Sequence, residues 1–222
     1  MIDNSVRDLL YSFGYLANVA FTARFLLQWF VSERQGKSVV PKMFWQMTIA
    51  GNLLLCIHAW MQLQFHVYAI SACNGVIAWR NLNLMGEHSK KISFRSTLWV
   101  LCAALMFTLF TFYISSSDGQ WFRVPQSFWS EQTQNVNLFW HFLGTIGLIL
   151  FSSRFWVQWW FAEKQQQSQL NALFWWLSLS GGLLSALYFL YIGDLVNAIG
   201  PGFGLVPYAR NLMLLYRKPL AV

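Results

Sequence analysis

Long apolar runs separated by short polar segments dominate the chain. A bilayer core about 30 Å thick needs roughly 20 apolar residues of helix to cross it. The windows that meet or approach this length are residues 9–31, 43–63, 67–85, 97–115, 138–161, 170–193 and 195–216. The pattern therefore predicts an all-α polytopic membrane protein with seven transmembrane helices. The segments at 64–66 and 193–194 are short enough only for tight turns between helices.

The composition supports a membrane protein and excludes several other classes. The chain is 56% hydrophobic and only 10% charged, whereas about a quarter of the residues of a soluble domain are charged. An aromatic content of 18% excludes a disordered or nucleic-acid-binding tail. The cysteines show no disulfide or zinc spacing, so we expect no metal ion, no cofactor and no nucleic acid partner.

The positions of the basic residues predict an orientation. Positively charged loops stay in the cytoplasm. The side reached after the first, third, fifth and seventh predicted helices carries Arg34, Lys37, Lys42, Lys90, Lys91, Arg95, Lys164, Arg217 and Lys218. The other side carries Arg7 and Arg123. We therefore predict an external N-terminus, a cytoplasmic C-terminus and a long external loop at 116–137.

The two halves of the chain repeat each other at a shift of 130 residues, without a gap. The pairs include charged and amide residues inside the predicted helices, which general hydrophobic bias does not produce. The matched pairs are Arg24 with Arg154, Gln28 with Gln158, Glu33 with Glu163, Ser38 with Ser168, Trp45 with Trp175, Gly51 with Gly181, Arg80 with Arg210 and Asn81 with Asn211. The sequence therefore predicts an internal duplication.

Each repeat contains three predicted helices, and the helix at 97–115 has no counterpart. One linking helix between two odd units makes the units run in the same direction through the membrane, a 3+1+3 arrangement like that of SWEET transporters. We therefore expect a first repeat at 1–95, a linker helix and outer loop at 96–137, and a second repeat at 138–222. A cleft between the repeats is a natural substrate site, although duplication for packing alone is the alternative.

Two segments of the chain carry a family resemblance. Residues 24–45 read RFLLQWFVSERQGKSVVPKMFW, and residues 154–176 read RFWVQWWFAEKQQQSQLNALFWW. Each, with the Arg-Asn-Leu that follows at 80–82 or 210–212, resembles the lipid A biosynthesis N-terminal domain family, which is related in topology to SWEET and PQ-loop proteins. The second copy departs from the first in having Asn171 in place of Pro41 and Gln167 in place of Lys37.

The resemblance implies a role in lipid A and lipopolysaccharide biosynthesis at the inner membrane of Gram-negative bacteria. The family takes its name from its attachment, in some bacteria, to the enzyme that makes lipid A disaccharide. The resemblance does not bring that enzyme's activity with it, because a soluble glycosyltransferase domain does not fit into a chain whose predicted helices use most of its length.

Four arginines fall inside predicted helices, five to seven residues before their cytoplasmic ends: Arg24, Arg80, Arg154 and Arg210. An arginine at the centre of a membrane costs about 2.5 to 3.5 kcal/mol on insertion scales, so each needs a partner, water or a route to the headgroups. One interpretation is that their long side chains reach the interface. The other is that they face the cleft together with the amides Gln28, Gln158, Asn81 and Asn211.

Glu33 and Glu163 are the nearest acids to these arginines. We expect Glu33 to pair with Arg80, and Glu163 with Arg210, inside each repeat. Two positive charges then remain, and Arg24 and Arg154 become the candidate ligands of an anion. The planar guanidinium suits bidentate contact with a phosphate. The nearby tryptophans, including Trp45 and Trp175, are expected mostly at the membrane interface, with a minority available to stack on a sugar.

These observations predict an inner-membrane transporter or flippase of an anionic lipid-linked sugar or a lipid A-related glycolipid. Its partners would be a phosphate-bearing lipid, the surrounding membrane lipids and, as a candidate, a glycosyltransferase. One alternative is a non-catalytic membrane subunit that docks a glycosyltransferase, and another is a SWEET-like carrier of free sugar. An enzyme ranks lower because the sequence shows no carboxylate pair, nucleophile with base, or metal cluster.

Overall fold

The computed structural model describes residues 4–86, 92–115, 121 and 137–216, and their regular structure is helical. A short α1 (Asn4–Leu9) and a 3-10 turn (Leu10–Phe13) lead into the long helices. These are α2 (Gly14–Gln35), α3 (Lys42–Met61), α4 (Phe65–Leu84), α5 (Phe94–Ser115), α6 (Leu138–Gln165), α7 (Ala172–Tyr191) and α8 (Leu195–Tyr216). The tight turns expected before α4 and α8 are confirmed, whereas the predicted external loop at 116–137 lies outside the described residues except for 121 and 137.

Equivalent residues shape both repeats at the loop that follows their first helix. A left-handed residue ends α2 at Gly36 (φ 63°) and α6 at Gln166 (φ 51°). An extended residue then starts the next helix, namely Pro41 before α3 and Asn171 before α7. The side chain of Asn171 accepts a hydrogen bond from the Phe174 amide, so the second copy replaces the rigid proline by an N-cap.

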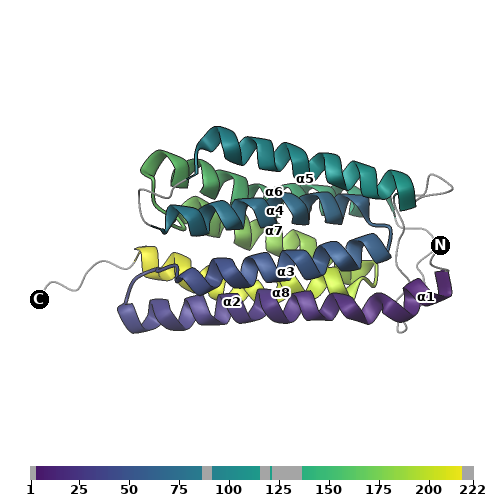
Figure 1. The fold of residues 1–222 in the computed structure, drawn as a ribbon. Coiled ribbons are helices and arrows are strands. Elements are labelled where there is room, and N and C mark those ends of the chain that lie inside the picture. The colour runs from purple at the N-terminus through teal and green to yellow at the C-terminus, as the bar shows by residue number, and fades with distance from the viewer. Residues whose placement is uncertain (1–3, 87–91, 116–120, 122–136, 217–222) are drawn as a thin grey trace, which may run out of the picture.

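The long helices form one bundle of roughly parallel and antiparallel rods (Figure 1). Within the first repeat α3 packs on α2 and α4, and within the second α7 packs on α6 and α8. The two repeats meet where α2 contacts α8 and where α4 contacts α6, while α5 packs on α4. The first helix of each repeat therefore contacts the third helix of the other repeat, as expected for two copies related by a two-fold axis.

Glycines allow the first two helices of each repeat to approach closely. A methyl group on Gly51 would lie 2.6 Å from the ring of Phe21, and one on Gly181 would lie 2.4 Å from the backbone nitrogen of Phe151. These glycines therefore permit close helix packing in both repeats.

Aromatic side chains from both repeats fill the centre of the bundle. Trp45 and Trp175 are fully buried in this core, together with Phe25, Phe155 and Tyr208. Trp45 and Trp175 therefore lie away from the membrane interface, where most of the nearby tryptophans were expected. Trp45 contacts the second repeat by donating to Ser168 at 2.8 Å, whereas the ring of Trp175 packs beside Phe174 and Tyr208 of its own repeat.

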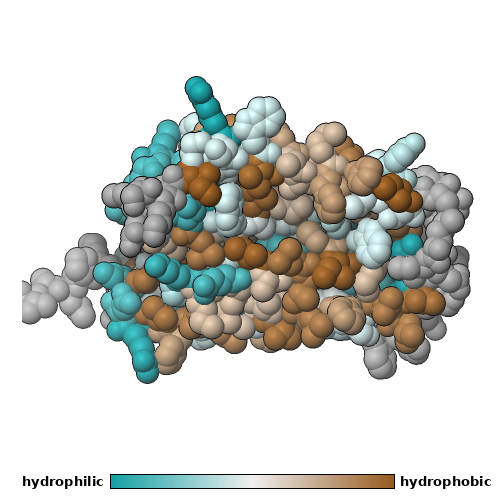
Figure 2. Space-filling model, viewed as in Figure 1, coloured by the Kyte–Doolittle hydropathy of each residue, from teal (hydrophilic) through white to brown (hydrophobic). Residues whose placement is uncertain are grey.

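Three helices, α5, α6 and α7, are long and apolar enough to cross a membrane among the residues that the structure describes. Large apolar side chains on α5 and α6, such as Trp99, Phe110, Tyr113 and Phe142, are exposed. The side of the molecule seen in Figure 2 is mostly apolar between its two ends, and hydrophilic side chains gather near the end where α8 finishes. This surface supports membrane association, and the crossing of all seven long helices stays a prediction.

Candidate functional site

A reciprocal pair of amides joins α2 of the first repeat to α8 of the second. Gln28 Nε2 donates to Asn211 Oδ1 at 2.8 Å, and Asn211 Nδ2 donates back to Gln28 Oε1 at 3.0 Å. The hydroxyl of Ser38 also donates to Asn211 Oδ1, at 2.9 Å. Both amides are fully buried, and these bonds satisfy groups that burial would otherwise penalise.

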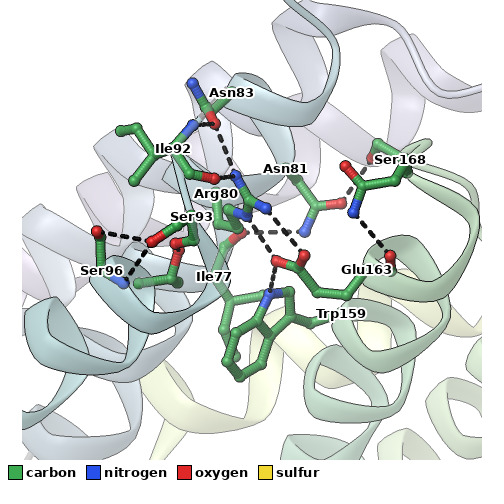
Figure 3. Close-up of polar contacts among 12 residues, drawn as sticks. Ile77, Arg80, Asn81, Asn83, Ile92, Ser93, Ser96, Trp159, Glu163 and Ser168 are labelled. Atoms are coloured by element: carbon green, nitrogen blue, oxygen red, sulfur yellow. Dashed lines mark hydrogen bonds and ion pairs between the residues drawn. The ribbon is translucent and has the colours of Figure 1, made fainter. Parts of the chain in front are cut away.

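The equivalent residues make the same contacts between α6 and α4. Gln158 Nε2 donates to Asn81 Oδ1 at 2.6 Å, and Asn81 Nδ2 donates to Gln158 Oε1 at 2.9 Å. Ser168, the counterpart of Ser38, donates to Asn81 Oδ1 at 2.7 Å (Figure 3). The four predicted amides therefore form two matched pairs that bridge the repeats.

The ion pairs also cross between the repeats, which corrects the pairing expected from the sequence. Arg80 donates two hydrogen bonds to the carboxylate of Glu163, from Nε at 2.5 Å and from Nη2 at 2.8 Å. Arg80 Nη1 donates to the side chain of Asn83 and to the backbone oxygen of Ile92 (Figure 3). In the same way, Glu33 pairs with Arg210 of the other repeat.

The reason for this exchange is the arrangement of the helices. Glu33 ends α2, whose neighbour in the other repeat is α8, and Glu163 ends α6, whose neighbour is α4. Within one repeat, the acid lies on the first helix and the arginine on the third. The second helix packs between these two helices and keeps them apart. Sequence order alone did not reveal which third helix each acid would face.

These residues define a polar layer at the end of the bundle where α2, α4, α6 and α8 finish. Its members are Gln28, Glu33, Ser38, Arg80, Asn81, Gln158, Glu163, Ser168, Arg210 and Asn211. Trp29 and Trp159 donate to the carboxylates of Glu33 and Glu163, at 2.9 Å each. The polar layer therefore closes this end of the repeat interface with groups that already have partners.

Arg24 and Arg154 are held differently, one helical turn deeper into the bundle. Both are 97% removed from solvent, with 3% exposure each. Arg24 Nη1 donates to the hydroxyl of Thr48 at 2.8 Å, and Arg154 Nη1 donates to the hydroxyl of Tyr208 at 3.2 Å. The Nε atom of each is buried without a hydrogen-bond partner, and within the described part of the chain neither guanidinium forms an ion pair.

Aromatic rings replace carboxylates around these two cations. The guanidinium carbon of Arg24 lies 4.7 Å from the ring centre of Phe25 and 5.4 Å from that of Phe155. The guanidinium carbon of Arg154 lies 3.4 Å from the ring centre of Phe151 and 4.8 Å from that of Phe155. Such contacts stabilise a cation by about 0.5 to 2 kcal/mol, which leaves both positive charges unneutralised.

Arg24 and Arg154 line one shared cavity, which we call the arginine cavity. Its volume is about 120 Å³, and residues of both repeats line it, mainly from α2, α4, α6 and α8 with Asn52 and Leu55 of α3. From the arginines it extends to Val67, Val196 and Asn197, at the end of the bundle that carries the tight turns. The structure thus brings Arg24 and Arg154 together in the cavity and places the other eight predicted site residues in the polar layer.

The sequence analysis missed several polar residues that line the arginine cavity or hold its arginines. Asn18, Asn52 and Asn74 lie on its wall, and Thr48 and Tyr208 hold the two guanidinium groups. An asparagine inside an otherwise apolar helix was an available signal, because such a side chain is costly in a membrane without a partner. The comparison of the repeats did not indicate these asparagines, because the second repeat has no asparagine at the equivalent positions.

The sequence model of the lipid A Biosynthesis N-terminal domain family matches the chain twice, at residues 13–83 and 143–213. The chain is 41% identical over 213 residues to a lipid-A-disaccharide synthase of Chlamydia felis (strain Fe/C-56), covering 95% of this chain and 34% of that protein. It is 35% identical over 218 residues to a lipid-A-disaccharide synthase of Chlamydia pneumoniae, covering 98% of this chain and 35% of that protein. No solved structure matches the chain.

The two matched ranges begin 130 residues apart, at 13 and 143, which is the shift that superposes the polar layer on itself. The chain spans about a third of the length of the curated relatives that it matches. The predicted duplication is confirmed, and the chain belongs to the lipid A biosynthesis N-terminal domain family and carries that domain twice.

Proposed function

We propose that the chain is an inner-membrane transporter or flippase for an anionic lipid-linked sugar or a lipid A-related glycolipid. In this proposal all seven long helices cross the membrane as two parallel repeats, 1–95 and 138–222, joined by the segment 96–137. The N-terminus is periplasmic and the C-terminus cytoplasmic, because the described basic residues Arg34, Lys37 and Lys164 lie at the end closed by the polar layer. The relatives named for lipid A synthesis support the connection to envelope glycolipids.

The observation that carries this proposal is the pair of unneutralised arginines in the arginine cavity. A buried cation without a carboxylate is costly, so Arg24 and Arg154 have more to gain from an anionic ligand than the partnered Arg80 and Arg210. Two forked guanidinium groups facing one space match a phosphate, which accepts hydrogen bonds from several directions. A neutral sugar offers no charge to complete the site.

The shape of the site supports binding of a headgroup with the acyl chains left outside. A cavity of about 150 Å³ holds a benzene molecule, so about 120 Å³ accommodates a group of the size of a phosphate, and an attached sugar would extend toward the tight turns. The hydrocarbon chains would remain beside the apolar flanks of the bundle. This division is typical of a carrier that moves only the polar group of a lipid through protein.

Alternating access follows from the two ends of the repeat interface. The arginine cavity leads toward the tight turns, which face the periplasm in the proposed orientation, and the polar layer closes the cytoplasmic side. Opening that side requires the paired amides and ion pairs to separate while the repeats rock against each other around the site. The repeats are also joined toward the tight turns, where Tyr11 donates to Asp194 at 2.8 Å, so access from the periplasm would require the same rocking motion.

Translocation in vesicles tests the proposal. Proteoliposomes with a fluorescent phosphate-linked glycolipid are assayed for the fraction of lipid that becomes accessible from the opposite leaflet. We expect the variants Arg24→Leu and Arg154→Leu to reduce the rate at least tenfold, and Arg34→Leu, which changes an exposed arginine of α2, to leave it unchanged. Transport unaffected by both cavity variants, or equal transport of an uncharged sugar, would contradict the proposal.

A second candidate function is a membrane subunit that docks a glycosyltransferase and presents its lipid acceptor. The observation that favours it is the relation in length, since the matched relatives are named as synthases and are about three times longer than this chain. Copurification of the full chain with a glycosyltransferase, together with the absence of transport by the chain alone, would favour this function over the first.

A further inference from the structure

We infer that the first repeat provides a wall of side-chain amides that recognises the sugar attached to the phosphate. This inference rests on the proposed function and deepens it. The amide wall consists of Asn18 on α2, Asn52 on α3 and Asn74 on α4, all of which line the arginine cavity. It makes the cavity selective for a phosphate that carries a hydroxyl-rich or acetamido-bearing sugar over a phosphate with an apolar substituent.

The amide wall has no counterpart in the second repeat. In the alignment of the two repeats, Leu148 is the counterpart of Asn18, Gly182 of Asn52 and Gly204 of Asn74. The polar layer, by contrast, keeps the same amides in both copies. Asn18 also joins the repeats through Val196, and the second repeat contributes Asn197, whose side chain donates to Asp194. The printed bond of Asn52 stays within α3, and Asn74 Oδ1 has no partner among the described residues. This unequal set of amides points to contact with something that has no two-fold symmetry.

The amides also retain hydrogen-bonding capacity. The Oδ1 atom of Asn74 is buried and has no hydrogen-bond partner among the described residues. Leaving such a group unpaired costs about 1 to 3 kcal/mol, which a donor on a ligand would recover. Asn18 and Asn52 are themselves oriented by bonds from their Nδ2 atoms to the backbone oxygens of Val196 and Thr48, at 2.8 and 2.7 Å.

The depth of these residues defines the orientation of the ligand. Arg24 lies one helical turn from Gln28 of the polar layer, whereas Asn74 lies about two turns from Asn81. At 1.5 Å per residue these positions are roughly 6 and 10 Å from the polar layer. The phosphate would therefore sit innermost, between the arginines, and the sugar would point toward the tight turns, alongside the amide wall.

The chemistry of the amide group fits a sugar. An asparagine side chain offers two donors and a carbonyl acceptor, which match hydroxyl and acetamido groups that both donate and accept. It carries no charge, so it adds little to the attraction of a bare phosphate. The arginines would therefore provide affinity for the phosphate, and the asparagines would distinguish what the phosphate carries.

Two probes of equal charge separate these contributions. Dodecyl methyl phosphate and dodecyl N-acetylglucosaminyl phosphate are both singly charged phosphodiesters, and their affinities for the detergent-solubilised full chain are measured by calorimetry. We expect the wild-type protein to bind the sugar-bearing probe at least tenfold more tightly. Asn74→Ala should reduce this preference to threefold or less while the affinity for the methyl probe stays unchanged, and Arg154→Leu should weaken both probes by a similar factor.

The matched control is Asn137→Ala, which removes an exposed asparagine that caps α6 and should preserve the preference. Equal affinity of the wild-type protein for the two probes would contradict sugar recognition by the amide wall without contradicting phosphate binding by the arginines. This measurement requires no variant. A preference that survives Asn74→Ala and Asn52→Ala would also overturn it. Binding of neither probe would overturn the proposed function together with this inference.

Discussion

The two ends of the repeat interface use the same kinds of residues in opposite ways. In the polar layer every predicted arginine and amide has a partner from the other repeat, and both the amide pair and the ion pair occur twice. In the arginine cavity the cations Arg24 and Arg154 lack carboxylate partners, and the asparagines of the first repeat have lost their counterparts. Symmetric and satisfied contacts mark the structural end of the interface, and asymmetric, incompletely satisfied groups mark the candidate binding end.

The difference shows which residues stay the same in both copies after duplication and which residues diverge. A contact between two copies related by a two-fold axis is made twice, so a change in either copy damages the packing. A ligand between the copies has no such axis, and one wall can diverge while the other is kept. If the proposed function holds, divergence between the repeats marks recognition, and recurrence marks the contacts that join the copies.

The largest effect on stability is expected from the more buried of the two ion pairs. The side chains of Arg80 and Glu163 are 2% and 11% exposed, whereas those of Arg210 and Glu33 are 38% and 35% exposed. Glu163→Ala should cost about 3 to 5 kcal/mol because it leaves a buried charge unpaired. Glu33→Ala should cost about 1 kcal/mol or less. Unfolding in detergent measures both, and equal losses would contradict the assigned difference.

The next effect concerns the amide pairs of the polar layer. Asn81→Leu or Gln158→Leu alone should cost about 1 to 3 kcal/mol, because each leaves the other amide buried and unsatisfied. The double variant should cost less than the sum, and a double-mutant cycle on unfolding free energies gives the coupling. Asn211 and Gln28 should give the same coupling within about 0.5 kcal/mol. A clear mismatch between the copies would show that the layer is not symmetric in energy.

A smaller effect on stability is expected at the binding end. Arg154→Met should leave the unfolding free energy within about 1 kcal/mol of wild type or raise it, because it removes a buried charge without a carboxylate partner. The same variant should weaken the binding of an alkyl phosphate at least tenfold. Arg80→Met is the matched comparison and should destabilise the protein. A large loss of stability in Arg154→Met would indicate a structural role for this arginine.

The smallest effect comes from the left-handed residues that end α2 and α6. Gln166 adopts φ 51° where the first repeat has Gly36 at φ 63°. Gln166→Gly should stabilise the protein by about 0.5 to 1 kcal/mol, because a side chain in this conformation is strained. The gain is reduced by loss of the bond from Gln166 Nε2 to the Glu163 backbone oxygen. Gly36→Ala should destabilise by about 1 kcal/mol, and thermal melting distinguishes the two signs.

The sequence alone was sufficient for the helical fold and the duplication. Apolar runs of fixed length predicted the long helices, since helix length and hydrophobicity are local properties of the chain. The shift of 130 residues aligned Gln28 with Gln158 and Asn81 with Asn211, and the matched family ranges confirmed it. The equivalent positions of Arg24 and Arg154 within apolar segments also indicated that both face one cleft between the repeats.

The tertiary structure decided which residues face each other. Glu163 contacts Arg80 and not Arg210 because α6 packs on α4, and Trp45 is buried because the other repeat covers it. The sequence predicted which two arginines would lack a carboxylate, but not which acid each of the other two would meet. Contacts between the repeats depend on how helices far apart in the sequence pack together. The periodicity of a single helix does not determine which helix of the other repeat it will contact.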